Sequence, residues 1–460
     1  MKKRTHYFIT IIVLGTMIVF NGCKIGQNYV RPVVDSPEKF GLNNDTTAST
    51  TIDWWTLFNN SELDTLIRIA LENNHNLLQA ARSVEQANFQ LSIQKLNLLP
   101  QFSANGSATR GNYLGAKTDN INNGFVIGAQ ASWDLDFWGK YRRLSESARA
   151  QLLASEYGLA SIQIELVASV ARTYFQLLEY RESLYISQST LSLRDSTLRV
   201  IKQRFDAGLV PEIDLNSAQI QRAAAAGSIP KYRILVQNTE GALAMLLGRY
   251  PGSFQVGGKM VEMTTPPEIP AGLPSQLLER RPDVLVAEQQ LVAQNAMIGV
   301  ARSNQLPSIS LTGFLGGASS QLSDLTGNGI AWNAGGAILA PLFNWRQYAN
   351  KVKVEKSKYE ASVLAYQQAA LQAFIDVENS LNEVANLKLQ QSAVEEQAIA
   401  AMKTLKLASD RYDKGVASYI EYLDAQRQSY DAQLALANIR QQVLTAYVKL
   451  YQALGGGWSI

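Results

Sequence analysis

The sequence predicts a mainly α-helical chain with a few amphipathic β-strands, built as two copies of one unit. RFDAGLVPEIDLNSAQ, residues 204–219, reads almost the same as RYDKGVASYIEYLDAQ, residues 411–426, which begins 207 positions later. We call this distance the repeat offset. LPQF at 99–102 aligns with LPSI at 306–309 at the same offset, and DFW at 136–138 falls on LFN 206 positions later. Internal repeats decide an architecture before local patterns do, so we interpret the chain as a tandem duplication of a unit of about 200 residues.

The first segment, residues 1–22, is predicted to be a lipoprotein signal peptide. Basic residues 2–4 precede a mostly apolar run over 7–20, which is followed by Gly22 and the only cysteine, Cys23. A basic start, an apolar stretch of about 14 residues and a small residue before the cut are typical of a secretory signal. We expect Cys23 to be acylated and to become the mature N-terminus. An ordinary signal or an uncleaved anchor with an incidental cysteine is the alternative.

Composition argues against several classes of function. The 460 residues carry 42 basic and 39 acidic side chains, with no basic stripe of the kind that binds nucleic acid. One cysteine rules out a disulfide within the chain, and two histidines, His6 and His75, leave too few ligands for a zinc site. His75 lies in the polar run ENNHN, which is typical of a solvated position. The sequence has no GxxxxGK[ST] phosphate loop. We therefore predict no catalytic, cofactor or metal site, and no enzyme.

Each unit begins with a predicted helix that a proline ends. The first helix covers 61–98 and stops at Pro100, and the second covers 275–305 and stops at Pro307. The period of the apolar residues then changes from 3.6 to 2, which indicates strands.

A predicted β-hairpin follows each of these helices, over 101–134 and 308–340. In the first hairpin Phe125, Ile127 and Trp133 alternate with small polar residues, and a loop rich in Gly and Asn joins the two segments. Segments of about 10 residues with one apolar and one polar face are typical of membrane strands around a wet lumen. A soluble hairpin packed on a core fits this pattern equally well.

Two long helices come next. Residues 140–207 contain one glycine, Gly158, and no proline, and residues 345–414 contain neither. If continuous, each stretch spans on the order of 100 Å. Gly208 and Gly415 follow, where glycine suits a helix end, and return helices then run to Leu247 and to Leu454. Each pair of helices fits a tube wall or an ordinary bundle core equally well.

The strands cannot close a barrel within one chain. An open sheet edge has no partner for its backbone groups in hydrocarbon, and the smallest closed barrels have about eight strands. Strands that span a membrane must therefore be pooled between copies of the chain. A barrel of about eight strands is filled by its own side chains, whereas 12 strands can leave a channel.

The sequence resembles the outer-membrane efflux protein family of the TolC/OprM type, in the lipoprotein branch that serves resistance-nodulation-division pumps. The resemblance covers nearly the whole chain. It rests on NYVRP after Cys23, on DWWTLF at 53–58, on the tips RFDAG and RYDKG, and on LDAQR at 423–427. Its most specific part is GLPSQLLERRPDVLVAEQQLVAQNAMIGVAR at 272–302.

The resemblance implies a homotrimer in which four strands per chain make a twelve-stranded outer-membrane barrel. A long α-helical barrel with a mixed equatorial domain continues it into the periplasm. The expected parts after the signal peptide are a collar segment, the first repeat, an equatorial linker, the second repeat and a tail: 23–60, 61–247, 248–274, 275–454 and 455–460.

The function that this resemblance implies is a passive outer-membrane exit duct of a tripartite efflux pump for small molecules. The implied partners are a periplasmic adaptor, a proton-driven inner-membrane pump and outer-membrane lipid, with no nucleic acid and no cofactor. A duct for type I protein secretion, and a periplasmic coiled-coil scaffold lipoprotein without a pore, are the alternatives.

Two sets of site residues follow. Tyr412, Asp424 and Arg427 match family positions that hold the periplasmic end closed, and Ile420 adds apolar closure. An ordinary surface pair of Asp424 and Arg427 is the alternative. The tips are expected to contact the adaptor, although their glycines could merely cap helices; the tip residues are Arg204, Gly208, Arg411 and Gly415. The sequence departs from the family at 344–346, NWR, where a turn with glycine is usual, and at Pro211.

Overall fold

The computed structural model describes residues 24–35, 53–111, 121–252, 256–267, 274–325, 327, 330–456 and 458. The predicted signal peptide and Cys23 lie outside these residues. The chain forms two compact units, which we call the strand unit and the tip unit. The strand unit comprises Met1–Val33, Ser83–Glu156 and Val286–Gln368, and the tip unit comprises Val34–Arg82, Tyr157–Leu285 and Ala369–Ile460.

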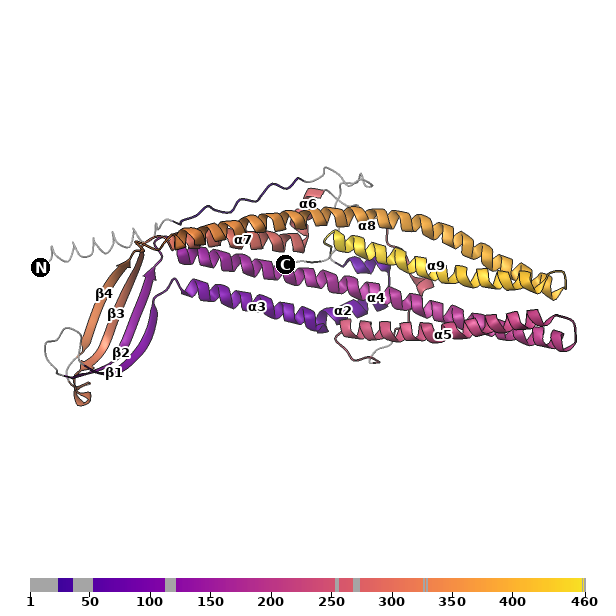
Figure 1. Ribbon diagram of the computed structural model, residues 1–460, viewed down its shortest axis with the longest axis horizontal. Helices are drawn as coiled ribbons and strands as arrows, with labels where there is room; N and C mark the ends of the chain where they lie inside the picture. Colours follow the sequence, from indigo (N-terminus) through magenta and orange to yellow (C-terminus); the bar gives the residue numbers. More distant parts are fainter. Residues whose placement is uncertain are drawn as a thin grey trace. The chain divides into compact units, whose positions relative to one another are not determined.

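The strand unit contains one antiparallel sheet in the order β1-β2-β3-β4 (Figure 1). Its strands are β1 (Gln101–Gly111), β2 (Asn122–Leu135), β3 (Ser308–Ser319) and β4 (Ala331–Leu339). The two predicted hairpins, 101–134 and 308–340, are therefore present, and the pairing of β2 with β3 joins them into a single sheet.

The helices repeat in number, and all but the first of each repeat also match in length. The first repeat has α2 (Ser61–Asn73), α3 (His75–Leu96), α4 (Lys140–Asp206) and α5 (Glu212–Leu246), and the second has α6 (Pro274–Arg280), α7 (Pro282–Ser303), α8 (Gln347–Asp413) and α9 (Tyr419–Ala453). α4 and α8 have 67 residues each, and α5 and α9 have 35 each. Short 3-10 helices are η1 (Trp54–Phe58), η2 (Met260–Glu262) and η3 (Leu322–Asp324). No helix among the described residues is both long and apolar enough to cross a bilayer.

Strand pairing fixes the alignment of the two repeats. Gln101 pairs with Ser132 in the first hairpin, and Ser308 pairs with Leu339 in the second, so both strands of the hairpin recur at the repeat offset. The first residues of α4 and α8, Lys140 and Gln347, are separated by the same offset. The alignment of 136–138 with 342–344, which is shorter by one position, is therefore wrong. Trp138 corresponds to Trp345.

The expected helix over 61–98 is broken at Asn74, which has extended backbone with ψ of 123°. Its side-chain oxygen accepts hydrogen bonds from the backbone N–H of Asn76 and of Leu77, at 2.9 and 3.1 Å, and so caps α3. Its side-chain nitrogen donates to the Leu246 carbonyl at 2.8 Å. One buried amide thus ties the break to the end of the return helix, α5.

The helix expected over 275–305 is broken at the equivalent position, Arg281. The following residue, Pro282, disfavours helical backbone at Arg281. The Arg281 guanidinium donates to the Ala453 carbonyl at 3.3 Å, and Ala453 is the equivalent of Leu246 in the second repeat. Ion pairs with Asp283 and Asp376 hold the guanidinium in place. Different side chains therefore make the same tie in both repeats.

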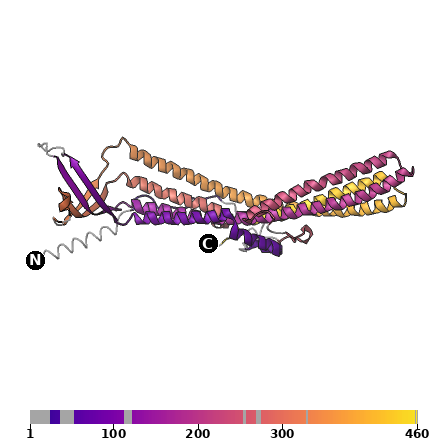
Figure 2. The same ribbon diagram turned by 90° about the horizontal axis from the view of Figure 1, so that it is seen from below.

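The core of the tip unit includes DWWTLF at 53–58, which belongs to the expected collar segment 23–60. Trp54, 1% exposed, stacks on Tyr451 with ring centroids 4.9 Å apart. Phe58 packs on Phe175 at 5.1 Å. Aromatic rings bury large apolar areas, so this segment is a structural part of the unit. Toward the tips, α4, α5, α8 and α9 run side by side in both views (Figures 1 and 2).

The helical hairpin tips as the candidate functional site

Both tips turn on a glycine with left-handed backbone. Gly208 has φ of 70°; its N–H donates to the Phe205 carbonyl at 2.8 Å, and the Leu209 N–H donates to the Arg204 carbonyl at 2.8 Å. This pair of bonds closes the C-terminus of α4. Gly415 has φ of 76° and makes the equivalent pair at the end of α8. Positive φ strains residues with a side chain, which explains glycine at both positions.

An aromatic cluster lies inside the second tip. Tyr412 is 7% exposed and stacks on Tyr422, with ring centroids 5.5 Å apart and planes at 13°. Tyr419 packs against Tyr412 at 5.9 Å. The Arg204 guanidinium, from the first tip, lies 4.7 Å from the centre of the Tyr412 ring, close enough for a cation–π interaction. Burial raises the pKa of the Tyr412 hydroxyl, so Tyr412 is neutral at physiological pH.

Asp424 and Arg427 form an ion pair one turn apart on α9. Arg427 donates to an Asp424 carboxylate oxygen at 2.8 Å, and Gln428 donates to the other at 2.5 Å. Both side chains of the ion pair are exposed, and Ile420 is 69% exposed. Within one chain the predicted gate residues thus lie in two different environments. Tyr412 belongs to the interior of the tip, whereas Asp424, Arg427 and Ile420 face outward.

Arg411 closes the second tip by a different contact from that of Arg204. It donates to the Glu421 carboxylate at 3.1 Å and to the Val416 carbonyl at 3.4 Å. Ser418 caps α9 by accepting from the Glu421 N–H at 3.2 Å. The equivalent position in the first tip is Pro211, which makes no side-chain cap. The two tips therefore share a backbone turn and differ in side-chain contacts.

Sequence reasoning missed a set of polar contacts that α4 makes with α5 and α9. Arg194 is 4% exposed, donates to the Gln221 carbonyl at 2.7 Å and lies 5.6 Å from the centre of the Tyr430 ring. One turn further along α4, Thr197 accepts from Gln426 at 3.2 Å. No motif marks these residues, because they are far apart in sequence. When a helix has little apolar periodicity, its sequence does not show which of its polar residues face another helix, or which residues they contact.

Comparisons with known proteins agree with the repeat. The family model "Outer membrane efflux protein" matches residues 66–249 and again 273–456. The cation efflux system protein CusC of Escherichia coli is 32% identical over 449 residues, covering 96% of this chain and 97% of that protein. The probable outer membrane lipoprotein SilC of Salmonella typhimurium is 31% identical over 460 residues, covering 98% and 99%.

Among solved structures, the outer membrane channel CmeC of Campylobacter jejuni superposes with a TM-score of 0.88 at 27% identity, over 95% of each chain. The family model accounts for most of the chain, and its two matches are separated by the repeat offset that the strand register fixes. The chain belongs to the outer membrane efflux protein family.

Proposed function

We propose that three copies of the chain form the outer-membrane exit duct of a tripartite efflux pump, which conducts small molecules passively from periplasm to exterior. A periplasmic adaptor and a proton-driven inner-membrane pump are its partners, and the tips are the end that meets the adaptor. The observation that carries the proposal is an open four-stranded sheet in a member of the outer membrane efflux family.

Unpaired sheet edges support assembly from several copies. Among the described residues, β1 and β4 each pair with one strand only. In hydrocarbon each unpaired backbone group costs several kcal/mol, so these edges need partners. Three copies supply the twelve strands that leave a channel.

The internal repeat gives the register between copies. Leu135 of β2 pairs with Ile309 of β3, where the first hairpin meets the second. The residue one repeat offset after Leu135 is Leu342, and the residue one repeat offset before Ile309 is Phe102; they are 94% and 79% exposed. β4 ends at Leu339, short of the position equivalent to Leu135. In our proposal Leu342 pairs with Phe102 of the next copy, which extends β4 and covers both side chains.

Thiol crosslinking tests this register. Leu342→Cys combined with Phe102→Cys is expected to give covalent dimers and trimers in membranes treated with a short bifunctional thiol reagent. Leu342→Cys combined with Ala104→Cys, a slip of two residues on the same face, is the matched control and should crosslink far less. Each single variant controls for reaction with Cys23. Equal crosslinking of both pairs, or none in either, contradicts the register.

Acylation of Cys23 is part of the proposal. It is supported by the single cysteine after the apolar run and by the likeness to SilC, whose name is "probable outer membrane lipoprotein". Metabolic labelling with a palmitate analogue should mark the wild type and not Cys23→Ala. Label on both proteins, or on neither, contradicts it. Because the proposed barrel itself anchors the protein in the outer membrane, the Cys23→Ala variant should keep part of the wild-type efflux activity.

Conductance separates the duct from a scaffold without a pore. Purified protein in a planar bilayer should give discrete single-channel openings, and a silent bilayer would contradict the duct. Deleting the gene and profiling sensitivity to toxic metals, dyes and drugs identifies the cargo. A loss of protein secretion with unchanged sensitivity to all of these would favour a type I secretion duct instead.

A further inference from the structure

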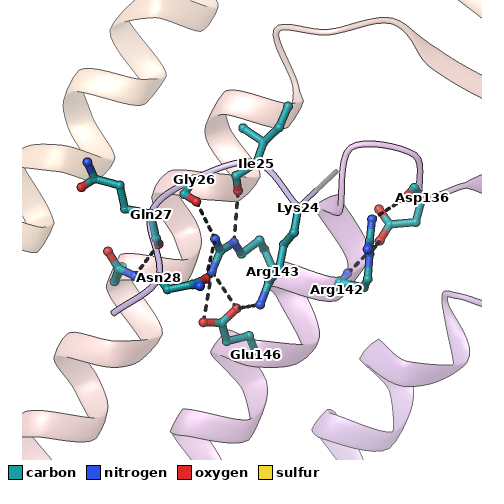
Figure 3. A network of polar contacts seen from close by, with 10 residues as sticks. Lys24, Ile25, Gly26, Gln27, Asn28, Asp136, Arg142, Arg143 and Glu146 are labelled. Atoms are coloured by element: carbon teal, nitrogen blue, oxygen red, sulfur yellow. Dashed lines mark hydrogen bonds and ion pairs between the residues drawn. The ribbon is translucent and has the colours of Figure 1, made fainter. Parts of the chain in front are cut away.

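The strand unit contains a buried arginine whose partners come from the first residues after Cys23 (Figure 3). Arg143, in the first turn of α4, is 1% exposed. Its Nε donates to the Ile25 carbonyl at 3.1 Å, and one terminal nitrogen donates to the Gly26 carbonyl at 2.8 Å and to the Asn28 side-chain oxygen at 3.3 Å. Three of its hydrogen bonds therefore end on three residues within the short stretch 25–28.

Glu146 links this arginine to Lys24. It accepts from Arg143 at 2.9 Å and forms an ion pair with the Lys24 ammonium (Figure 3). The Ile25 N–H donates to the Trp138 carbonyl at 3.1 Å, and the Asn295 side chain donates to the Gln27 carbonyl at 3.1 Å. Every residue from 24 to 28 is thus held by at least one polar contact.

Glycines make room for the backbone of this segment. A Cβ added at Gly299 would lie 2.8 Å from the Ile25 carbonyl oxygen, and one at Gly139 would lie 3.0 Å from the Lys24 Cα. Gly26 itself has φ of 103°, and an added Cβ would lie 3.0 Å from the Gly299 Cα. The segment is therefore packed against its neighbours more closely than residues with side chains allow.

The second repeat lacks this arrangement. The positions equivalent to Gly139, Arg143 and Glu146 are Arg346, Asn350 and Lys353, and the position equivalent to Gly299 is Ser92. By contrast, the tie to the end of the return helix, at Leu246 and at Ala453, is made in both repeats with different side chains. The set around Arg143 therefore serves something that the chain has once, and that is its mature N-terminal segment.

We infer that Arg143, with Glu146, is a binding site for residues 24–28, and that it holds the modified Cys23 on a rigid tether instead of a flexible linker. One peptide bond joins Cys23 to Lys24, so the proposed lipid is one residue away from a segment that is held at the first turns of α4. A buried guanidinium without partners is strongly disfavoured, so docking of the segment and burial of Arg143 occur together. The tether rests on the proposed acylation, whereas the binding site does not.

Trypsin provides a direct test, because Lys24 is a cleavage site inside the bound segment. Arg31 is followed by Pro32, a bond that trypsin resists, and Lys39→Gln in every variant removes the next site. Mass spectrometry then measures how fast a new N-terminus appears at Ile25. Wild type should be protected, since cleavage needs the segment to detach. Arg143→Met should be cleaved about 10- to 100-fold faster, as expected when hydrogen bonds from a charged group are lost.

Arg142→Met is the matched control. Arg142 pairs with Asp136 at 3.1 Å and is the neighbouring guanidinium, so its loss should leave the cleavage rate within about twofold of wild type. Gly299→Ala is a second test that removes no charge; its methyl group should displace the Ile25 carbonyl and also speed cleavage. If the Arg143→Met variant does not assemble, the cleavage rates of the Gly299→Ala and Asn28→Ala variants test the binding site in its place.

Rapid cleavage of wild type, or unchanged cleavage in both Arg143→Met and Gly299→Ala, overturns the binding site. The new N-terminus forms whether or not Cys23 is acylated. A protected bond in a protein that takes up no palmitate label would therefore keep the binding site and remove only the lipid tether.

Discussion

Arg346 adopts the backbone conformation that Gly139 adopts at the equivalent position of the first repeat, with φ of 63° against 77°. Trp345 beside it is also left-handed, with φ of 48°. In the first repeat two features require glycine at position 139. Its φ is positive, and an added Cβ would lie 3.0 Å from the Lys24 Cα. In the second repeat the fold keeps the turn although the residue carries a side chain, which costs about 1–2 kcal/mol.

Arg346→Gly should therefore stabilise the protein by about 0.5–1 kcal/mol, the strain relieved less the extra freedom of glycine in the unfolded chain. Thermal unfolding of the detergent-solubilised protein measures the change. Gln347→Gly, at the first residue of α8, is the neighbouring control and should destabilise. A lower melting temperature for Arg346→Gly would show that the guanidinium makes contacts that outweigh the strain.

Valine at Gly208 or Gly415 should destabilise each tip by about 1–3 kcal/mol, the cost of holding a β-branched residue at positive φ. Among the described residues, apart from the adjacent ones in the chain, no atom lies within 4 Å of an added Cβ at either position, so the strain comes from the backbone conformation and not from a clash with another part of the fold. Gly227→Ala, also in open space but inside α5, should be neutral or slightly stabilising. Hydrogen exchange at the tips measures the change. In cells, cysteine crosslinks between the tips and the adaptor should weaken with it.

Removing the exposed ion pair of α9 tests the gate. Asp424→Ala with Arg427→Ala should raise resting single-channel conductance and admit a large antibiotic such as vancomycin. Such pairs contribute about 0–1 kcal/mol each, so a closed state held by a few of them is easily shifted. Ser217→Ala, at the position equivalent to Asp424, should change neither readout. Wild-type conductance in the double variant would place the gate elsewhere and leave Asp424 and Arg427 as a surface pair.

Alkaline pH should loosen the second tip. Burial, and then the Tyr412 hydroxyl nearby, raise the pKa of Tyr419 from 10.0 to about 12. Between these values the unfolded chain ionises while the folded one does not, so stability is full below pH 10 and falls by about 2–3 kcal/mol toward pH 12. Melting temperatures at pH 9 and pH 11.5 should therefore differ less in Tyr419→Phe than in wild type. Exposed Tyr185→Phe should behave like wild type.

The sequence was enough to predict the repeat, the hairpins and the glycine turns, because each leaves a local signal: a recurring stretch, a period of two, a glycine after a helix without breakers. It did not reveal the breaks at Asn74 and Arg281. Pro282 is a local signal for the break at Arg281, but proline is also tolerated in the first turn of a helix, so it did not mark the break by itself. The Asn74 side chain is held by the Leu246 carbonyl, which lies 172 residues away in sequence.

The Arg143 site was missed for the same reason. Its partners at residues 25–28 lie 115 to 118 positions away, and a lone arginine in a helix has no pattern that identifies them. The gate residues were predicted from the family resemblance. The sequence pattern alone could not identify them, and their contacts within one chain show why. Asp424 accepts from Arg427 and Gln428 on the surface of one chain, and contacts that close the proposed gate would be made between copies.

The helical hairpins have equal lengths in the two repeats, with helices of 67 and 35 residues, and this limits which insertions and deletions the fold can accept. An insertion in α4 alone would push one tip of each copy beyond the other by about 1.5 Å for every residue added. The proposed trimer would then present six tips at two heights to a partner that must seal against all of them. Length changes should therefore occur as matched insertions or deletions in α4, α5, α8 and α9 together. The duct then becomes longer or shorter by the same amount around its whole circumference.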